Sequence, residues 1–164
     1  MQQQKDETFM RRAIVVAKAA AAASGTSPIG CVIVIDGTIV AEGSNEVGVR
    51  HDPTAHAEIV TIRRATEALQ ASDLPGATLY STLQPCGMCS MASIWAKIGR
   101  IVYGAGRGQV HRMYFEDRHL DTMDFIADAY RRDLSLTSGI LAAECASLYH
   151  QPDEDVPACK QGNI

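Results

Sequence analysis

The chain has 164 residues, of which 46% are hydrophobic, so it suits a single folded domain with one core and is unlike a wholly disordered chain. Its net charge of -4 differs from the basic excess of a dedicated nucleic-acid binder. No apolar run is long enough to cross a bilayer, and the acids at Asp6 and Glu7 argue against a signal peptide. The five unevenly spread cysteines are typical of reduced thiols. We therefore expect a cytoplasmic protein with no membrane partner.

The first half of the chain shows helical periodicity, then strand-like runs, then helical periodicity again. Apolar side chains recur at helical spacing from Phe9 to Ala20, and β-branched runs follow Pro28. Asp36-Gly37 lies between those runs and is a strong signal for a two-residue hairpin turn. The predicted elements are, in chain order, a helix at residues 7–24, strands at 29–35 and 38–42, a loop at 45–53 and a helix at 54–69.

The second half alternates strands with helices, which predicts parallel pairing in a partly mixed sheet. Residues 106–120 carry no clear pattern. Residues 151–164 combine prolines with acids and are expected to form a loose acidic tail after a single domain at residues 1–150. The predicted elements are a strand at 77–82, a helix at 87–97, a strand at 100–103, a helix at 121–131, a short strand at 134–137 and a helix at 140–149.

Two short segments bring together residue types that bind and use a metal ion. The first contains His56 and Glu58, and the second contains Cys86 and Cys89. A catalytic zinc takes three protein ligands and leaves its fourth position to water. One imidazole and two thiols complete such a set. His56, Cys86 and Cys89 are therefore the predicted ligands of one Zn²⁺ per chain.

The spacing within each segment supports this assignment. Cys86 and Cys89 are three residues apart at the start of a predicted helix, where they share a face and where the helix dipole lowers the pKa of a thiol. His56 and Glu58 are two apart and cannot line one side of a helix, but both can face a pocket over its end. There Glu58 is expected to take a proton from zinc-bound water and pass it to a departing amine, as a general acid–base catalyst.

Other interpretations of the cysteine pair fit less well. A redox pair is expected in a thioredoxin-like setting, which the helix-first order does not suggest. A structural zinc site needs a fourth protein ligand, and His51, His111, His119 and His150 lack ligand spacing. The rival from another class is a non-catalytic zinc module that binds RNA or a protein partner. Glu58 argues against that rival, because a structural site has no use for a carboxylate there.

With these motifs the chain resembles the cytidine deaminase superfamily, in its nucleobase and tRNA-adenosine deaminase branch. His-x-Glu followed by Pro-Cys-x-x-Cys is the zinc-deaminase pattern, and the resemblance runs from about Phe9 to Tyr149. It implies a three-layer α/β/α sandwich around a five-stranded mixed sheet, usually in a homodimer. It also implies that Asn45 hydrogen-bonds the base, although an ordinary turn residue is the alternative. Backbone groups near Ala57 and Gln84 would contact the base and its amine; most relatives have Glu or Ser in place of Gln84.

Three branches of the superfamily compete. The guanine and guanosine branch carries a Trp six residues after the second zinc cysteine, where this chain has Trp95, expected either to stack on a bicyclic base or to lie in the core. The tRNA-adenosine branch normally closes with a basic helix, whereas Asp153, Glu154 and Asp155 follow Tyr149 here, so tRNA is a disfavoured partner. The cytosine branch stays open. We expect hydrolytic deamination of a free aminated nucleobase or nucleoside, a guanine-type purine first, with tRNA-specific adenosine or cytosine deamination as alternatives.

Overall fold

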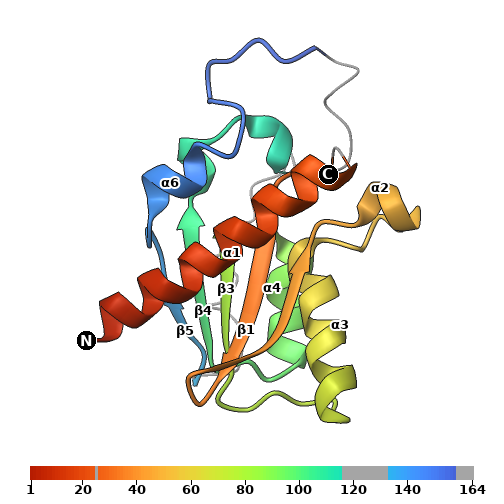
Figure 1. The fold of residues 1–164 in the computed structure, drawn as a ribbon, viewed down its shortest axis with the longest axis vertical. Helices are drawn as coiled ribbons and strands as arrows, with labels where there is room; N and C mark the ends of the chain where they lie inside the picture. Colours follow the sequence, from red (N-terminus) through yellow and green to blue (C-terminus); the bar gives the residue numbers. More distant parts are fainter. Residues whose placement is uncertain (25, 116–132, 158–164) are drawn as a thin grey trace.

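One mixed sheet organises the computed structural model, which describes residues 1–24, 26–115 and 133–157 (Figure 1). Its five strands lie in the order β2-β1-β3-β4-β5, with β1 antiparallel to β2 and β3, and with β4 parallel to β3 and β5. This confirms the expected five-stranded mixed sheet. In chain order the elements are α1 (Gln2–Ser24), β1 (Gly30–Ile35), β2 (Thr38–Ser44), α2 (Val47–Arg50), α3 (Ala57–Leu69), β3 (Thr78–Leu83), α4 (Gly87–Trp95), β4 (Arg100–Ala105), the 3-10 turns η1 (Arg107–Gln109) and η2 (Arg112–Tyr114), β5 (Ser135–Thr137) and α6 (Ala142–Ala146).

Helices cover both faces of the sheet, as the family resemblance implied (Figure 1). α1 and α6 pack on one face, where Gly30 of β1 lets α1 approach so closely that a Cβ would overlap the backbone of Ala13. α3 packs on the other face, where a Cβ at Gly43 of β2 would overlap the side chain of Thr61, and α4 lies beside α3. The two glycines are therefore required by close helix–sheet contact, and the fold has three layers.

The local turn chemistry behaves as the sequence predicted. Asp36 and Gly37 have φ values of 49° and 79°, and positive φ at both central residues is what a type I′ hairpin turn needs. The strands on either side pair antiparallel as β1 and β2. The short strand expected at 134–137 is also present, as β5.

The first half of the chain departs from expectation at three boundaries. α1 begins at Gln2 and not at residue 7, because glutamine is a good helix former even where no apolar periodicity marks a helix. Residues 47–50, expected as loop, form the helical turn α2. The helix expected at 54–69 begins only at Ala57, since His56 has an extended backbone and precedes the first turn.

The second half contains further corrections. α4 ends at Trp95, before Lys97 takes a left-handed φ of 56°, and α6 is shorter than the helix expected at 140–149 because Leu141 has a left-handed φ of 52°. β4 continues through Gly104 to Ala105. The helix expected at 121–131 lies outside the described residues. In the expected tail Val156 is buried, and none of the described helices is long and apolar enough to span a membrane.

A buried ion pair attaches α1 to the sheet. Arg100 of β4 donates hydrogen bonds from its two terminal nitrogens to the two carboxylate oxygens of Asp6, each at 2.8 Å, and the Tyr80 hydroxyl donates to Asp6 Oδ1 at 2.8 Å. Asp6 is only 2% exposed. Burial alone would raise the pKa of Asp6, but the hydrogen bonds from Arg100 and Tyr80 outweigh it, and the pKa is lowered. The carboxylate is therefore held ionised inside the protein.

Candidate metal centre and its surroundings

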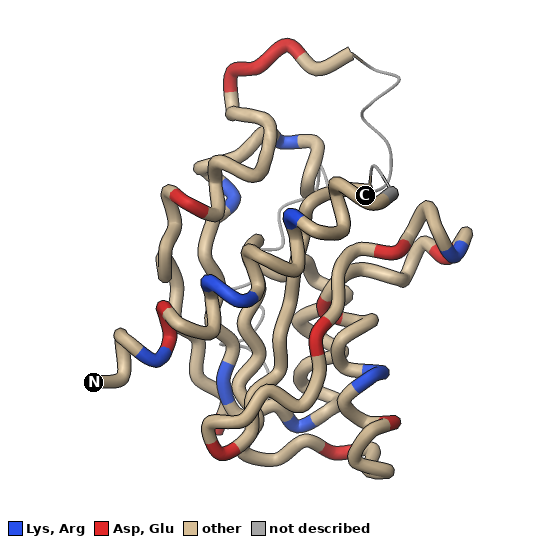
Figure 2. Tube along the Cα trace, viewed as in Figure 1, with Lys and Arg blue, Asp and Glu red and all other residues tan. Residues whose placement is uncertain are grey.

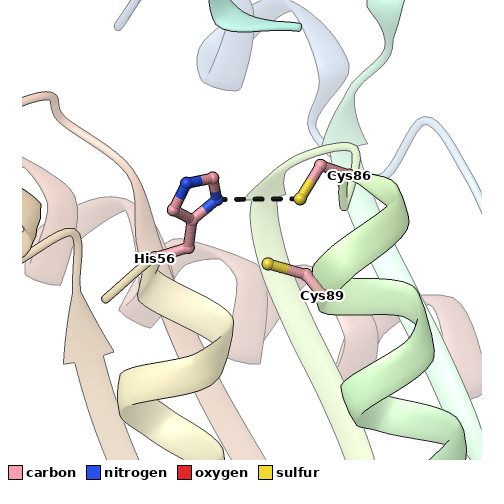
Figure 3. A group of neighbouring side chains, drawn as sticks. All are labelled: His56, Cys86 and Cys89. Carbon is pink, nitrogen blue, oxygen red and sulfur yellow. Dashed lines mark hydrogen bonds between the residues drawn. The ribbon is translucent and has the colours of Figure 1, made fainter. Parts of the chain in front are cut away.

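Two helix N-termini meet near the end of the sheet toward which β3 and β4 run. His56 is the residue before α3, and Cys86 is the residue before α4, reached from β3 through Gln84 and Pro85. Cys89 lies in the first turn of α4. Figure 3 shows the three side chains converging between the two helix ends. Because a helix N-terminus favours negative charge, this position suits thiolates.

The geometry fits a zinc ion. The donor atoms of His56, Cys86 and Cys89 all lie within 4.8 Å of one another, and His56 Nδ1 is 3.7 Å from Cys86 Sγ. Tetrahedral zinc holds nitrogen and sulfur ligands at about 2.0–2.3 Å, which places neighbouring ligand atoms about 3–4 Å apart. In the described part of the chain no fourth His, Cys, Asp or Glu joins this group. Three ligands with room for one more match a catalytic zinc better than a structural one.

The two thiols are electrostatically unequal. A hydrogen bond from Cys89 lowers the pKa of Cys86 to about 4 against the opposing effect of burial, and His56 contributes to the same shift. Conversely, the pKa of Cys89 is raised, because the thiol donates to Cys86 and is itself buried. Cys86 is therefore a thiolate at neutral pH. Since metal ligation needs the thiolate form at both cysteines, binding should release the Cys89 proton and depend on pH.

Glu58 lies beside the ligand group without belonging to it. It is the second residue of α3, it is 4% exposed, and its Oε1 accepts a hydrogen bond from Ser81 Oγ at 3.0 Å. Burial raises the pKa of Glu58, the charge of Cys86 raises it further, and His56 and Ser81 oppose the shift without cancelling it. Among the described residues no Lys or Arg forms an ion pair with Glu58. A carboxylate with a raised pKa is suited to accept and release a proton.

Three of the residues predicted to bind substrate lie next to the ligand segments. Asn45 is buried and its Oδ1 accepts from the backbone N–H of Val47 at 3.1 Å, which is the turn role considered as the alternative. Ala57 is buried directly after His56. The backbone N–H of Gln84 donates to Ala105, and its side-chain oxygen accepts from the backbone N–H of Arg107 at 3.0 Å. The contacts of these residues with a base stay predictions.

Trp95 is exposed, which overturns the core alternative for this residue. It is the last residue of α4, and the six residues after Cys89 carry it about 9 Å along the helix axis, away from the ligand end. Its side chain is 72% exposed. Within this chain it is therefore not a core residue, and its contact with a base stays a prediction.

Ser81 is a site residue that the sequence analysis missed. It lies on β3, it is fully buried, and it faces Glu58, whereas its neighbour Tyr80 faces Asp6 on the other side of the sheet. The available signal was a polar residue inside a central strand. A buried hydroxyl needs a partner, and here that partner is the carboxylate.

The chain is similar to characterised deaminases over most of its length. Residues 3–105 match the model of the cytidine and deoxycytidylate deaminase zinc-binding region. Guanine deaminase of Bacillus subtilis (strain 168) is 41% identical over 111 residues, which are 68% of this chain and 71% of that protein. A tRNA-specific adenosine deaminase of Buchnera aphidicola subsp. Baizongia pistaciae is 38% identical over 143 residues, 87% of this chain and 85% of that protein. The solved structure of guanine deaminase from Nitrosomonas europaea matches with a TM-score of 0.76 at 26% identity, covering 87% of this chain and 81% of the other.

Proposed function

The chain belongs to the cytidine and deoxycytidylate deaminase zinc-binding family. We propose that it removes the amine from a free nucleobase or nucleoside, and that a guanine-type purine is its preferred substrate. The family and the ligand geometry make it a zinc-dependent deaminase. The substrate, the roles of individual residues, one zinc per chain and a homodimeric assembly are parts of the proposal. Metal analysis and sedimentation would test the last two.

The residues of the site fit hydrolysis of a cyclic amidine. His56, Cys86 and Cys89 would hold zinc, which when bound acts as a Lewis acid and lowers the pKa of water toward neutrality. Glu58 takes a proton from the water that adds to the amidine carbon and delivers it to the amine nitrogen. The carbon–nitrogen bond then breaks and ammonia leaves. Glu58 is buried beside the ligand segments, where it can hold that proton between the two steps.

Asn45, Ala57 and Gln84 supply the polar groups for the base in this proposal. The oxygen of the Asn45 side chain is used by Val47, so its amide nitrogen remains as the donor to a base acceptor. The oxygen of the Gln84 side chain is likewise held by the backbone of Arg107. Guanine, adenine and cytosine all carry an amine beside a ring nitrogen, so the metal cannot choose among them. These polar contacts must make the choice, because a site built for them rejects bases that lack the matching groups.

The acidic charge near the C-terminal end is the reason that we propose a free base and not tRNA as the substrate. No Lys or Arg occurs between residues 133 and 157, and the acidic segment 153–155 lies at the end of the molecule toward which β4 points (Figures 1 and 2). That is the same end of the sheet from which Cys86 follows β3. RNA binding needs clustered cations against its phosphates. An acidic segment at this end favours a small neutral substrate.

Deamination of adenosine in tRNA is the second candidate, and the length of the similarity favours it. The tRNA-specific relative matches over 143 residues against 111 for the guanine deaminase, and several other similar proteins are tRNA-specific adenosine deaminases. In that case two arginines that follow β4 would contact the RNA phosphates. Arg112 is exposed, and the Arg107 guanidinium lies 4.5 Å from the centre of the Phe115 ring.

One parallel assay tests the proposal. Ammonia release is measured with zinc-loaded protein on guanine, guanosine, adenine and cytosine, and inosine formation is measured on a tRNA anticodon stem-loop at physiological salt, with the Glu58→Gln protein as the blank. We expect a guanine-type purine to be the preferred substrate and tRNA binding to be weak and salt-dependent, without inosine. Efficient inosine formation without turnover of free bases would reverse the ranking of the two candidates. Much faster turnover of cytosine than of any purine would replace the purine assignment.

A further inference from the structure

We propose that Ser81 is a positioning residue for Glu58, whose hydroxyl holds one carboxylate oxygen so that the other is directed to the reacting groups. This inference rests on the proposed role of Glu58. Ser81 Oγ lies 3.0 Å from Glu58 Oε1, with the serine fully buried and Glu58 only 4% exposed. The hydrogen bond is therefore shielded from water, where such a bond to a charged group is strongest.

A glutamate needs an external restraint of this kind. The terminal torsion of a glutamate side chain is broad and nearly two-fold, so rotamer preference does not fix the plane of the carboxylate. Proton transfer requires one oxygen within about 2.6–3.2 Å of the proton donor. The backbone N–H of Glu58 itself also bonds the carboxylate, but that group belongs to α3 and moves with it.

The bond from Ser81 ties Glu58 to a different element. Ser81 lies on β3, and the same segment continues through Leu83 into Pro85 and the ligand Cys86. The hydrogen bond therefore fixes the position of the Glu58 carboxylate, on α3, relative to the strand that leads into α4 and its cysteines. A general acid–base residue gains most from such a restraint, because a misplacement of about 1 Å can cost about 10²-fold in rate.

The other buried donors near Glu58 cannot take over this task. The Cys89 thiol hydrogen-bonds Glu58, but as a metal ligand it is a thiolate and has no proton to donate. The Thr61 hydroxyl donates its hydrogen bond to the backbone oxygen of Ala57 at 2.6 Å. Cys31 lies opposite Ser81 in the β1–β3 register, and a neutral thiol is only a weak donor. Ser81 is the remaining strong side-chain donor among the described residues around this carboxylate.

The neighbouring residue on β3 provides a matched control. Tyr80 donates its hydroxyl to Asp6 Oδ1 at 2.8 Å, on the opposite face of the sheet. Tyr80→Phe therefore also removes one buried hydroxyl-to-carboxylate hydrogen bond from the same strand. It leaves the Glu58 side of the sheet unchanged.

The test compares Ser81→Ala, Ser81→Thr and Tyr80→Phe as full-length, zinc-loaded proteins, with kcat, KM, zinc content and melting temperature measured for each on the best substrate of the ammonia-release screen. We expect Ser81→Ala to lower kcat by about 10- to 100-fold while KM stays within about twofold and zinc content is unchanged. Ser81→Thr, which retains the hydroxyl, should recover most of kcat. Tyr80→Phe should lower the melting temperature and keep kcat.

A second arm separates positioning from a structural effect. In a Glu58→Gln background, Ser81→Ala should leave the residual rate unchanged, because the residue it positions can no longer transfer a proton. The same proportional loss in both backgrounds, a wild-type kcat for Ser81→Ala, or an equal loss of kcat in Tyr80→Phe would each overturn the inference. A Glu58→Gln protein with near-normal turnover would instead remove the proposed function of Glu58 itself, so the two failures are distinguishable.

Discussion

Among the described residues each face of the sheet buries one carboxylate, and two consecutive residues of β3 donate hydrogen bonds to the two acids. Tyr80 donates to Asp6 on the face covered by α1 and α6, and Ser81 donates to Glu58 on the face covered by α3 and α4. The two acids are almost equally buried, at 2% and 4% exposure. In the described part of the chain their charged partners differ: Asp6 pairs with an arginine, whereas Glu58 pairs with no Lys or Arg and lies beside the predicted zinc ligands.

Asp6 has a bidentate partner in Arg100, and its pKa lies below the ordinary value in spite of burial. Among the described residues Glu58 has no such partner, and burial together with the nearby charge of Cys86 raises its pKa above the ordinary value. A buried acid that is neutralised by an arginine stays ionised and holds the structure together. A buried acid that lies beside the metal ligands without such an arginine can gain and lose a proton, and that is what a catalytic group must do.

Removal of the metal should give the largest effect and should act through the α3/α4 face. We expect chelation to abolish ammonia release and to lower the stability of the folded protein, by about 4 kcal/mol if zinc had been present at a thousand times its Kd. Cys86→Ala should not retain zinc, since it removes one of three ligands. Metal analysis and thermal melting measure both effects, and added zinc should rescue only the wild type. A melting temperature and an activity that a strong chelator leaves unchanged would contradict the metal centre.

Asp6→Asn should give the largest effect on the other face, and it should be an effect on stability. Arg100 would lose its partner in a largely buried position, which typically costs about 3 kcal/mol. Chemical denaturation measures the loss, and kcat should be unchanged because Asp6 lies across the sheet from Glu58. Glu42→Gln is the matched control, because it breaks the more exposed pair with Arg12 and should cost far less. A loss of kcat with unchanged stability in Asp6→Asn would contradict the division between the faces.

The sequence predicted the parts of the molecule whose signals are local. The Asp36-Gly37 turn is specified by two adjacent residues, and the ligand set His56, Cys86 and Cys89 is specified by short motifs at two helix starts. Long-range pairs carry no comparable signal. Asp6 and Arg100 are 94 residues apart, and an acid among polar residues at the start of a helix is as typical of a solvated surface as of a buried pair.

The sequence also did not show which way a side chain points. Trp95 has the spacing of a known branch, but the helix that carries it runs away from the ligands, and its ring is exposed. Ser81 and Tyr80 are adjacent in the sequence, yet alternation along β3 sends them to opposite faces. Only the packing of α1 and α3 on those faces shows which carboxylate each one meets.

Acid titration tests the same comparison of the two acids through a smaller effect, the pH dependence of the stability that Asp6 contributes. Because the pKa of Asp6 is lowered in the folded protein, its contribution to stability is complete above the unfolded pKa of about 3.9 and is lost as the pH falls through the folded pKa. The difference in melting temperature between wild type and Asp6→Asn should therefore be constant from pH 7 to about pH 5 and should narrow below about pH 4. The difference is the informative quantity, because Glu42 and Glu154 also have lowered pKa values and affect both proteins equally. A difference that widens in acid would have the wrong sign.

The most direct test of the division between the faces is ammonia release by Glu58→Gln and Asp6→Asn at equal zinc content, on the substrate that the wild type prefers. We expect Glu58→Gln to keep its zinc and its melting temperature while kcat falls by about 10²- to 10⁴-fold, because the proton carrier is gone. Asp6→Asn should keep kcat within about twofold of the wild type while melting at a lower temperature. Near-normal turnover by Glu58→Gln, or equal losses of kcat in the two variants, would contradict the assignment of catalysis to the α3/α4 face.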